Sequence, residues 1–167
     1  MELAILIGLQ ASGKTTFYRR HLSDTHVHVS KDLFGRSSRR KQARQLRQIA
    51  EALEAGRNVA VDNTNPSPEE WRPLIETGRR HGARITGYWF PPDVPAAVAR
   101  NAARPRENRV PDVGIYATLK RLREPRHADG FDALRSVRLD GTGGFDVTAV
   151  DRAPAREEGT GRAAEGP

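Results

Sequence analysis

The sequence predicts an α/β fold of three layers, in which helices cover both faces of a mostly parallel, five-stranded sheet. Two observations predict it. Apolar or β-branched segments alternate with helical ones along the chain. The first apolar segment also runs directly into a glycine-rich loop that precedes a helix. In such a fold the crossovers are right-handed, and ligands bind at the carboxyl ends of the strands.

Local signals define each element. The expected strands, rich in apolar and β-branched residues, cover residues 3–7, 25–30, 58–62, 84–90 and 136–139. The expected helices cover residues 13–22, 38–55, 67–81, 94–103 and 113–124. The second helix has a serine cap at Ser38 and a stop at Gly56. The third opens with Pro68 and two acids and ends at Gly82, and Pro125 ends the last.

The composition suits a single domain and limits the classes of function. The 167 residues carry a net charge of +7 and no cysteine. The lack of cysteine excludes disulfides and thiolate metal sites and fits a reducing compartment, so we expect a cytoplasmic location. There is no apolar run long enough for a membrane span or a signal peptide. A basic balance favours a polyanionic partner, although an arginine-rich proteome would also produce it.

The C-terminal region differs in composition from the rest. A glycine-rich stretch follows the last expected strand, and residues 151–167 contain no large apolar side chain. Such a segment cannot bury enough surface to offset the entropy of ordering it. We therefore expect a folded domain over residues 1–140 and a flexible tail over residues 141–167.

A phosphate-binding loop, GLQASGKT, occupies residues 8–15. Its glycines allow the backbone N–H groups and the following helix N-terminus to point at a phosphate. Lys14 can reach the β- and γ-phosphates of a nucleoside triphosphate, and the hydroxyl of Thr15 can ligate Mg²⁺. The cofactors expected are ATP and Mg²⁺. The expected nucleotide-binding residues are Gly8, Gln10, Ala11, Ser12, Gly13, Lys14, Thr15 and Thr16.

Two aspartates follow strands and therefore belong at the same edge as the loop. Asp62 ends the third strand, as in a Walker B segment, where the carboxylate holds Mg²⁺ directly or through water. Asp32 follows the second strand and is the best candidate for a base that accepts a proton from an attacking hydroxyl. On position alone, a helix-cap or surface-loop role explains Asp32 equally well.

The residues DNTNP at 62–66, together with the loop and Asp32, resemble the polynucleotide 5′-hydroxyl kinases, especially the kinase domain of polynucleotide kinase/phosphatase enzymes. The segments RNAARPRE (100–107) and VPDVGIYATLKRLREPRHADGF (110–131) are similar to the family's lid and the region after it. The resemblance covers residues 1 to about 140. It implies a P-loop kinase fold with a helical lid over about residues 99–126, Asp32 as general base, and Arg104 and Arg106 as catalytic residues beside Lys14.

The resemblance also implies acceptor contacts. The family binds the acceptor phosphate with an arginine just after the base, and Arg36 lies one place later than expected. Arg40, Arg44 and Arg47 share a helix face that could contact phosphates, and a solvated face of an amphipathic helix explains them equally well. Arg121 and Arg123 are expected on a solvated face of the lid. The expected acceptor-binding residues are Arg36, Arg40, Arg44, Thr64 and Asn65.

The function expected from the resemblance is transfer of the γ-phosphate of ATP to a 5′-hydroxyl end of DNA or RNA, with nucleic acid as substrate and no protein partner. Three alternatives remain: a P-loop kinase for a small-molecule hydroxyl such as a sugar, antibiotic or toxin-type substrate; a non-catalytic nucleotide-binding module; and a nucleic-acid-binding protein switched by nucleotide. The five histidines have no fixed metal spacing, so no zinc site is expected.

Overall fold

A six-stranded sheet forms the centre of the computed structural model, which describes residues 1–35 and 39–152. The strand order is β2-β3-β1-β4-β5-β6, with every pair parallel except β5–β6. The strands are β1 (Glu2–Ile7), β2 (His26–Val29), β3 (Asn58–Asp62), β4 (Arg84–Trp89), β5 (Ala133–Leu139) and β6 (Phe145–Ala149).

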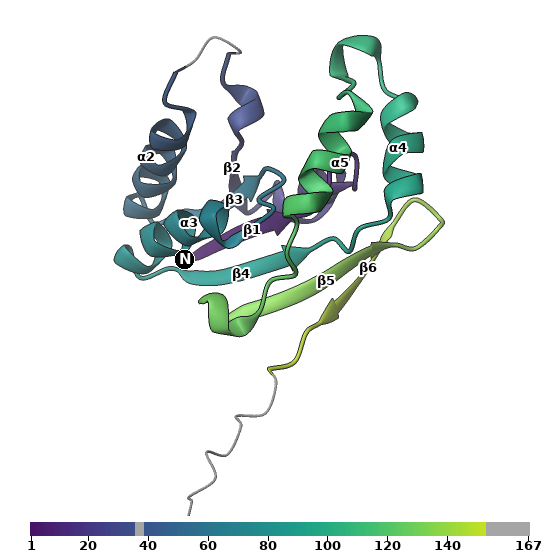
Figure 1. Cartoon of the computed structure of the whole chain (residues 1–167). Helices are drawn as coiled ribbons and strands as arrows, with labels where there is room; N and C mark the ends of the chain where they lie inside the picture. Colours follow the sequence, from purple (N-terminus) through teal and green to yellow (C-terminus); the bar gives the residue numbers. More distant parts are fainter. Residues whose placement is uncertain (36–38, 153–167) are drawn as a thin grey trace, which may run out of the picture.

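Helices cover both faces of this sheet, as predicted (Figure 1). The α-helices are α1 (Lys14–Phe17), α2 (Lys41–Glu54), α3 (Pro68–Arg80), α4 (Val94–Ala102) and α5 (Asp112–Arg121). A π-helix, η1 (Tyr18–Leu22), continues α1 directly. Three short 3₁₀ turns are η2 (Lys31–Leu33), η3 (Arg106–Asn108) and η4 (His127–Asp129). No described helix has both the length and the apolar character needed to cross a membrane.

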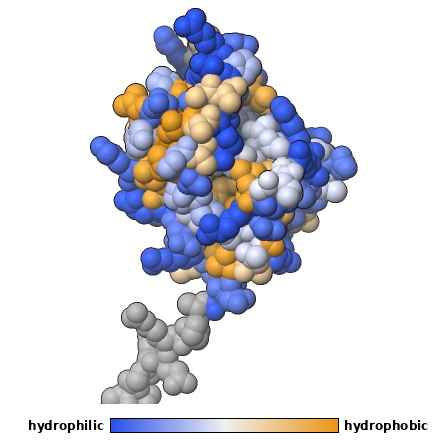
Figure 2. Space-filling view, turned by 90° about the vertical axis from the view of Figure 1, so that its right-hand side faces the viewer, coloured by the Kyte–Doolittle hydropathy of each residue, from blue (hydrophilic) through white to orange (hydrophobic). Residues whose placement is uncertain are grey.

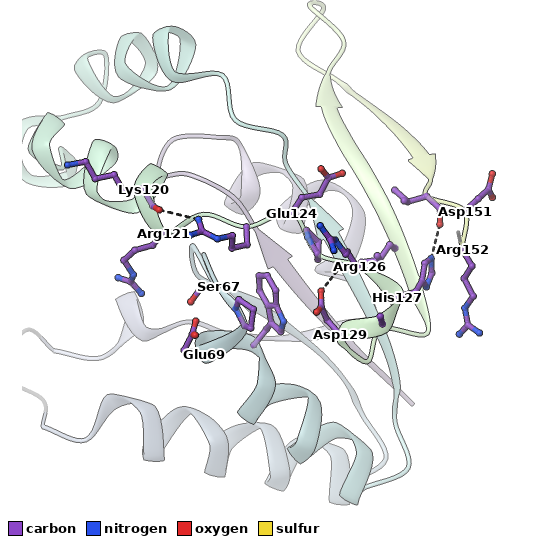
Figure 3. Close-up of a pocket in the computed structure, with 17 residues that line it drawn as sticks. Ser67, Glu69, Lys120, Arg121, Glu124, Arg126, His127, Asp129, Asp151 and Arg152 are labelled. Carbon is purple, nitrogen blue, oxygen red and sulfur yellow. Dashed lines mark hydrogen bonds between the residues drawn. The ribbon is translucent and has the colours of Figure 1, made fainter. Parts of the chain in front are cut away.

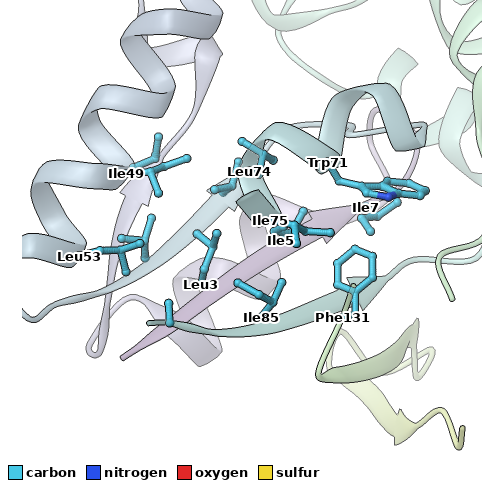
Figure 4. Close-up of a cluster of buried hydrophobic side chains, with 14 of the residues drawn as sticks. Leu3, Ile5, Ile7, Ile49, Leu53, Trp71, Leu74, Ile75, Ile85 and Phe131 are labelled. Carbon is cyan, nitrogen blue, oxygen red and sulfur yellow. The ribbon is translucent and has the colours of Figure 1, made fainter. Parts of the chain in front are cut away.

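The larger part of the core lies between the sheet and helices α2 and α3. Alternate residues of β1 point to this side, where Leu3, Ile5 and Ile7 are fully buried (Figure 4). They pack against apolar side chains from α2, α3, β4 and the segment before β5, which are Ile49, Leu53, Trp71, Leu74, Ile75, Ile85 and Phe131. Both faces of β1 are buried, as is typical of a central parallel strand.

The other face of β1 packs against α1 and η1. Leu6 contributes to a cluster with Phe17, Tyr18 and Phe90, and Phe145 of β6 packs against it. The first helix was predicted as one α-helix over residues 13–22, but only Lys14–Phe17 is α-helical. Beyond Phe17 the turn widens, and Ser23 N donates to the carbonyl of Tyr18, five residues earlier.

The predictions of five strands and of a flexible tail over residues 141–167 differ from the structure, because Phe145–Ala149 forms a sixth strand, β6; residues 153–167 of that tail lie outside the described residues. The stretch between β5 and β6 is a tight turn and not a linker. The side chain of Asp140 accepts hydrogen bonds from the backbone N–H groups of Thr142 and Gly144. Phe145 then reaches the ring of Phe17, with 5.3 Å between the ring centroids. This distant contact supplies the burial that the local composition lacks.

Helices α4 and α5, which overlap the segment 99–126 expected to be a lid and are called the lid helices below, stand at the carboxyl edge of the sheet (Figure 1). Ala97 of α4 and Ile115 of α5 pack against Leu9 of the phosphate-binding loop. Asn101 closes the connection between the two helices, since its side chain both donates to and accepts from the backbone of Val110.

The face to the right of Figure 1 is largely hydrophilic with scattered apolar residues (Figure 2).

The approach of α3 to the sheet generates a stability prediction. A Cβ at Gly78 would lie 2.5 Å from Cδ1 of Ile85 and 2.8 Å from Cδ2 of Leu3. We expect Gly78→Val to lower the free energy of unfolding by about 1–3 kcal/mol through overpacking. Gly35→Ala is the control, because nothing lies within 4 Å of its Cβ position. Chemical denaturation measures both, and a Gly78→Val protein as stable as Gly35→Ala would contradict the tight packing.

Candidate active site

The phosphate-binding loop connects β1 to α1 and is held by the segment after β3. Gly8 N donates to the carbonyl of Thr64 at 3.0 Å. A Cβ at Gly8 would lie 2.8 Å from that of Phe90, so no larger residue fits there. Ala11 and Gly13 both have positive φ, at 56° and 98°, and Gly13 precedes the first turn of α1. These turns produce the backbone that the sequence pattern predicts for an anion-binding loop.

Lys14 lies buried within this loop. Its ammonium donates to the carbonyls of Gly8 and Leu9, at 3.0 and 2.5 Å, and to the hydroxyl of Ser12 at 3.2 Å. Burial lowers the pKa of Lys14 to about 8, the charges of Asp62 and Asp32 oppose this effect, and Arg104 adds to it. The charged groups of Asp32 and Arg104 therefore act on the ammonium that would meet a phosphate.

Asp62 lies at the end of β3, directly beside β1, where Asp62 pairs in register with Leu6. One carboxylate oxygen, Oδ2, accepts from the hydroxyl of Thr15 at 2.7 Å and contacts Nε2 of His28 at 3.1 Å. Burial alone would raise the pKa of the Asp62 carboxyl. The hydrogen bonds from His28 and Thr15, with the charge of Lys14, hold that pKa below its usual value.

The donors at this position fit a magnesium ion bound together with a nucleotide. Thr15 supplies a hydroxyl and Asp62 an ionised carboxylate, both hard oxygen ligands of the kind that Mg²⁺ prefers. Across residues 1–35 and 39–152, no group of three or more His, Cys, Asp or Glu side chains could hold a metal alone. A cation here would thus need phosphate and water oxygens to complete its coordination.

Asp32 lies in the turn η2, immediately after β2, at the carboxyl edge where it was predicted. Its backbone N–H donates to the side chain of Ser30 at 3.3 Å. The preceding N–H, of Lys31, donates to Oδ1 of Asn63 at 2.9 Å. The turn that carries Asp32 is thereby tied to the DNTNP segment after β3, while the Asp32 residue itself stays exposed.

The two other DNTNP residues assigned to the acceptor occupy different surroundings. Thr64 is half-buried, and its carbonyl supports the phosphate-binding loop. Asn65 is buried with φ of 42°, and its side-chain amide donates to the carbonyl of Leu6 at 2.8 Å. Asn65 was predicted to contact the acceptor, but its amide is used to join the ends of β1 and β3. The Thr64 side chain remains a candidate.

Both lid helices contact the phosphate-binding loop. Arg100 of α4 donates through Nε to the carbonyl of Ala11 at 2.6 Å, and Gln10 donates to the hydroxyl of Thr118 on α5 at 2.9 Å. Arg100 was not assigned from the sequence. The predicted Arg104 is half-buried and lies just beyond the end of α4, which finishes at Ala102. Arg106 lies beyond α4, in the exposed turn η3.

The predicted acceptor arginines differ in their surroundings. Arg36 lies outside the described residues. Arg40 is exposed with φ of 59° at the start of α2, which therefore begins later than the predicted Ser38. Arg44 is also exposed, and its guanidinium lies 4.5 Å above the ring centroid of Phe34. The α2 face thus presents cations beside the turn that carries Asp32.

Arg121 is not simply solvated, as the sequence had suggested. It forms an ion pair of 2.7 Å with Glu70 at the start of α3, and Glu70 also lies 3.5 Å from Lys31. Beyond this bridge, a cavity of about 1230 Å³ lies under the segment from α5 to β5 (Figure 3). It is lined by the start of α3, residues of that segment and the residues that follow β6, and by none of the phosphate-binding loop.

With this geometry established, comparison with known proteins identifies the family. Residues 3–126 match the AAA domain family. The chain belongs to this family.

Solved structures share the fold of this AAA domain. A chain of the Pnkp1/Rnl/Hen1 complex is 28% identical, with a TM-score of 0.53 over 59% of this chain and 38% of that one. A fungal RNA kinase is 16% identical, with a TM-score of 0.64 over 83% and 38%. A gluconokinase from Sinorhizobium meliloti 1021 is 17% identical, with a TM-score of 0.60 over 83% of each chain. The chain thus has the P-loop kinase fold and spans 38% of the length of the first two.

The lowered pKa of Lys14 predicts proton uptake on nucleotide binding. In the free protein, a pKa of about 8 leaves Lys14 mostly neutral at pH 9. A bound triphosphate favours the ammonium and raises its pKa again, so binding takes up about one proton at pH 9 and little at pH 7. Calorimetry in buffers of different ionisation enthalpy measures this uptake.

The control is Lys14→Arg, because a guanidinium does not titrate in this range. Equal uptake by the wild-type protein at pH 7 and pH 9 would contradict the assignment of Lys14 to the phosphates.

Proposed function

We propose that the chain transfers the γ-phosphate of ATP to a 5′-hydroxyl end of DNA or RNA. The observation that carries this proposal is the meeting of two charged groups at one edge of the sheet. Lys31 N, beside the candidate base Asp32, donates to Asn63 at 2.9 Å. Thr64 of the same segment accepts at 3.0 Å from Gly8 of the loop that carries Lys14. A kinase that activates a hydroxyl beside the γ-phosphate needs this arrangement.

On the donor side, the loop N–H groups and Lys14 would bind the phosphates. Arg100 of α4 reaches the loop through Nε and keeps its two terminal nitrogens for a phosphate, and the charge of Arg104, which follows the end of α4, acts on Lys14. Such cations stabilise charge that moves toward the leaving group. Thr15 and Asp62 would hold Mg²⁺, which would supply positive charge beside the β- and γ-phosphates.

On the acceptor side, the carboxylate of Asp32 would accept the proton of the 5′-hydroxyl. The hydroxyl oxygen forms the new bond to the γ-phosphorus, and the bond from that phosphorus to the β–γ bridging oxygen breaks. ADP leaves with the bonding electron pair, and the proton on Asp32 passes to solvent afterwards. Asn63, which accepts from Lys31 N, fixes the turn from which Asp32 acts.

Two features favour a polynucleotide acceptor. The DNTNP segment resembles the polynucleotide kinases, and its Asn63 is tied to the turn that carries Asp32. The exposed cations of α2 lie beside the same turn, where phosphates of a nucleic acid backbone could bind. The second candidate is a small-molecule kinase, which the likeness to a gluconokinase over 83% of both chains favours.

The role of Asp32 is tested by Asp32→Asn. We expect kcat to fall by about 10²–10⁴-fold, because the amide cannot accept the proton. Affinity for ATP should change little, since no described hydrogen bond joins the Asp32 side chain to the phosphate-binding loop. Asp24→Asn is the matched control, because Asp24 is exposed and precedes β2 at the opposite edge of the sheet. Equal turnover by the two variants would remove Asp32 from the mechanism.

The arginines of the lid region should differ in their effect on kcat, because they differ in position. We expect Arg100→Ala and Arg104→Ala each to lower kcat by about 10²-fold or more, since they act where charge develops. Arg106→Ala should have a smaller effect, because Arg106 is exposed in η3 beyond the helix. Single-turnover kinetics measures the rate of transfer in each variant, and separate measurements of nucleotide affinity exclude an effect on binding. Equally large losses in Arg104→Ala and Arg106→Ala, with little effect of Arg100→Ala, would instead support the assignment made from the sequence.

The acceptor is tested with labelled ATP and a panel of 5′-hydroxyl DNA, 5′-hydroxyl RNA, nucleosides and gluconate. We expect an oligonucleotide to be phosphorylated most efficiently, with a KM that rises with salt. Arg44→Glu should raise this KM, reduce its logarithmic salt dependence by about 1, and leave the KM for ATP unchanged. Arg57→Glu, at an exposed residue just before β3, is the matched control. Efficient transfer to gluconate alone would establish the small-molecule kinase instead.

A further inference from the structure

His28 lies within β2 and contacts the carboxylate of the candidate metal site. Its Nε2 is 3.1 Å from Oδ2 of Asp62, and 25% of the His28 side chain is exposed against 6% of that of Asp62. The sequence showed only a histidine in an alternating strand. The pairing of β2 with β3, in which His28 lies opposite Ala60, brings its ring to the end of β3.

The ring of His28 is held in place by a second aromatic ring. Tyr18 stacks on it with 4.1 Å between centroids and an angle of 14° between planes. The hydroxyl of Tyr18 donates to the carbonyl of His26 at 2.9 Å, so Tyr18 is itself fixed to β2. Tyr18 begins the π-helix η1, directly after the helix that carries Thr15. The support for His28 thus comes from the same segment as the other donor to Asp62.

Both donors reach the same carboxylate oxygen. Thr15 and His28 each contact Oδ2 of Asp62, and no described residue is hydrogen-bonded to Oδ1. A carboxylate held by two donors on one oxygen cannot rotate freely, and its second oxygen keeps a fixed direction. Such outer contacts to a metal-binding carboxylate commonly change metal affinity when they are removed.

We propose that His28 is a positioning residue that orients Asp62, so that Oδ1 is presented to the cation that accompanies a bound nucleotide. This inference rests on the nucleotide and Mg²⁺ binding of the proposed function. It requires no particular acceptor, and it does not require that phosphate be transferred.

Two substitutions separate hydrogen bonding from packing. His28→Phe keeps a ring to stack on Tyr18 and loses the donor. His28→Gln places a donor at a similar distance from the backbone and loses the aromatic ring. If His28 acts through Asp62, the Gln variant should resemble the wild-type protein and the Phe variant should not. If His28 serves only the packing around Tyr18, the order should be reversed.

Calorimetry measures the affinity for ADP at a series of controlled free Mg²⁺ concentrations. We expect His28→Phe to need about 10-fold or more Mg²⁺ for half-maximal enhancement of ADP binding. ADP affinity in EDTA should stay unchanged, and His28→Gln should restore most of the Mg²⁺ response. An unchanged Mg²⁺ response in His28→Phe would overturn the inference, as would an equal loss in both variants.

Thermal melting of each variant checks that it is folded. If His28→Phe does not fold, His28→Leu replaces it. A Mg²⁺ response lost in His28→Leu and restored in His28→Gln would then support the inference, and an equal loss in both variants would overturn it. The test is independent of the acceptor. A wild-type protein that binds ADP with Mg²⁺ but phosphorylates no 5′-hydroxyl would end the proposed function and leave the role of His28 to be decided by the binding data.

Discussion

The parallel pairing of β1 with β3 is the constraint on which the whole site depends. The register places Asp62 opposite Leu6, two residues before the phosphate-binding loop begins. The chain then uses backbone and amide groups after β3 to hold the loop, through Gly8 with Thr64 and Asn65 with Leu6. A slip of one residue in this register would point Asp62 to the opposite face of the sheet and remove it from Thr15.

This arrangement buries the ammonium of Lys14, and the resulting loss of folding stability depends on pH. The folded-state pKa of Lys14, about 8, lies below the unfolded value, so the charged form is disfavoured by folding. The displacement corresponds to about 3 kcal/mol, which destabilises the fold below pH 8 and is relieved as the pH rises toward 10.5. A polyphosphate bound to the loop would offset the same cost, because its negative charge would stabilise the buried ammonium. The burial that disfavours charged Lys14 in the free protein would therefore favour ligand binding.

The sequence predicted the parts of the site that depend on local pattern. The loop 8–15 and the strand-ending Asp62 carry their chemistry in adjacent residues, and the position of Asp32 at the carboxyl edge follows from strand order alone. The remaining features depend on distant contacts. β6 forms because Phe145 reaches Phe17, which its glycine-rich surroundings do not reveal.

The same limit applied to single side chains. Arg100 contacts Ala11 because its side of α4 faces the phosphate-binding loop. The spacing of residues along a helix does not show which side faces the loop. His28 contacts Asp62 only because β2 pairs with β3 and Tyr18 supports its ring. Asn65 was assigned to an acceptor from the resemblance, but its positive φ and burial give its amide a role in the sheet.

The contacts between lid and loop indicate how nucleotide binding would be transmitted. The ion pair of Arg121 with Glu70 is largely exposed, and such pairs contribute only about 0–1 kcal/mol, so it attaches α5 to α3 weakly. The stronger attachment is the burial of Leu9 against Ala97 and Ile115, with the hydrogen bonds that join Gln10 to Thr118 and Arg100 to Ala11. The contacts of this stronger attachment all involve the phosphate-binding loop, at Leu9, Gln10 and Ala11. A change in the loop at Leu9, Gln10 or Ala11 would therefore alter the packing of both helices, and phosphates bound to the loop would act on α4 and α5 without any separate relay.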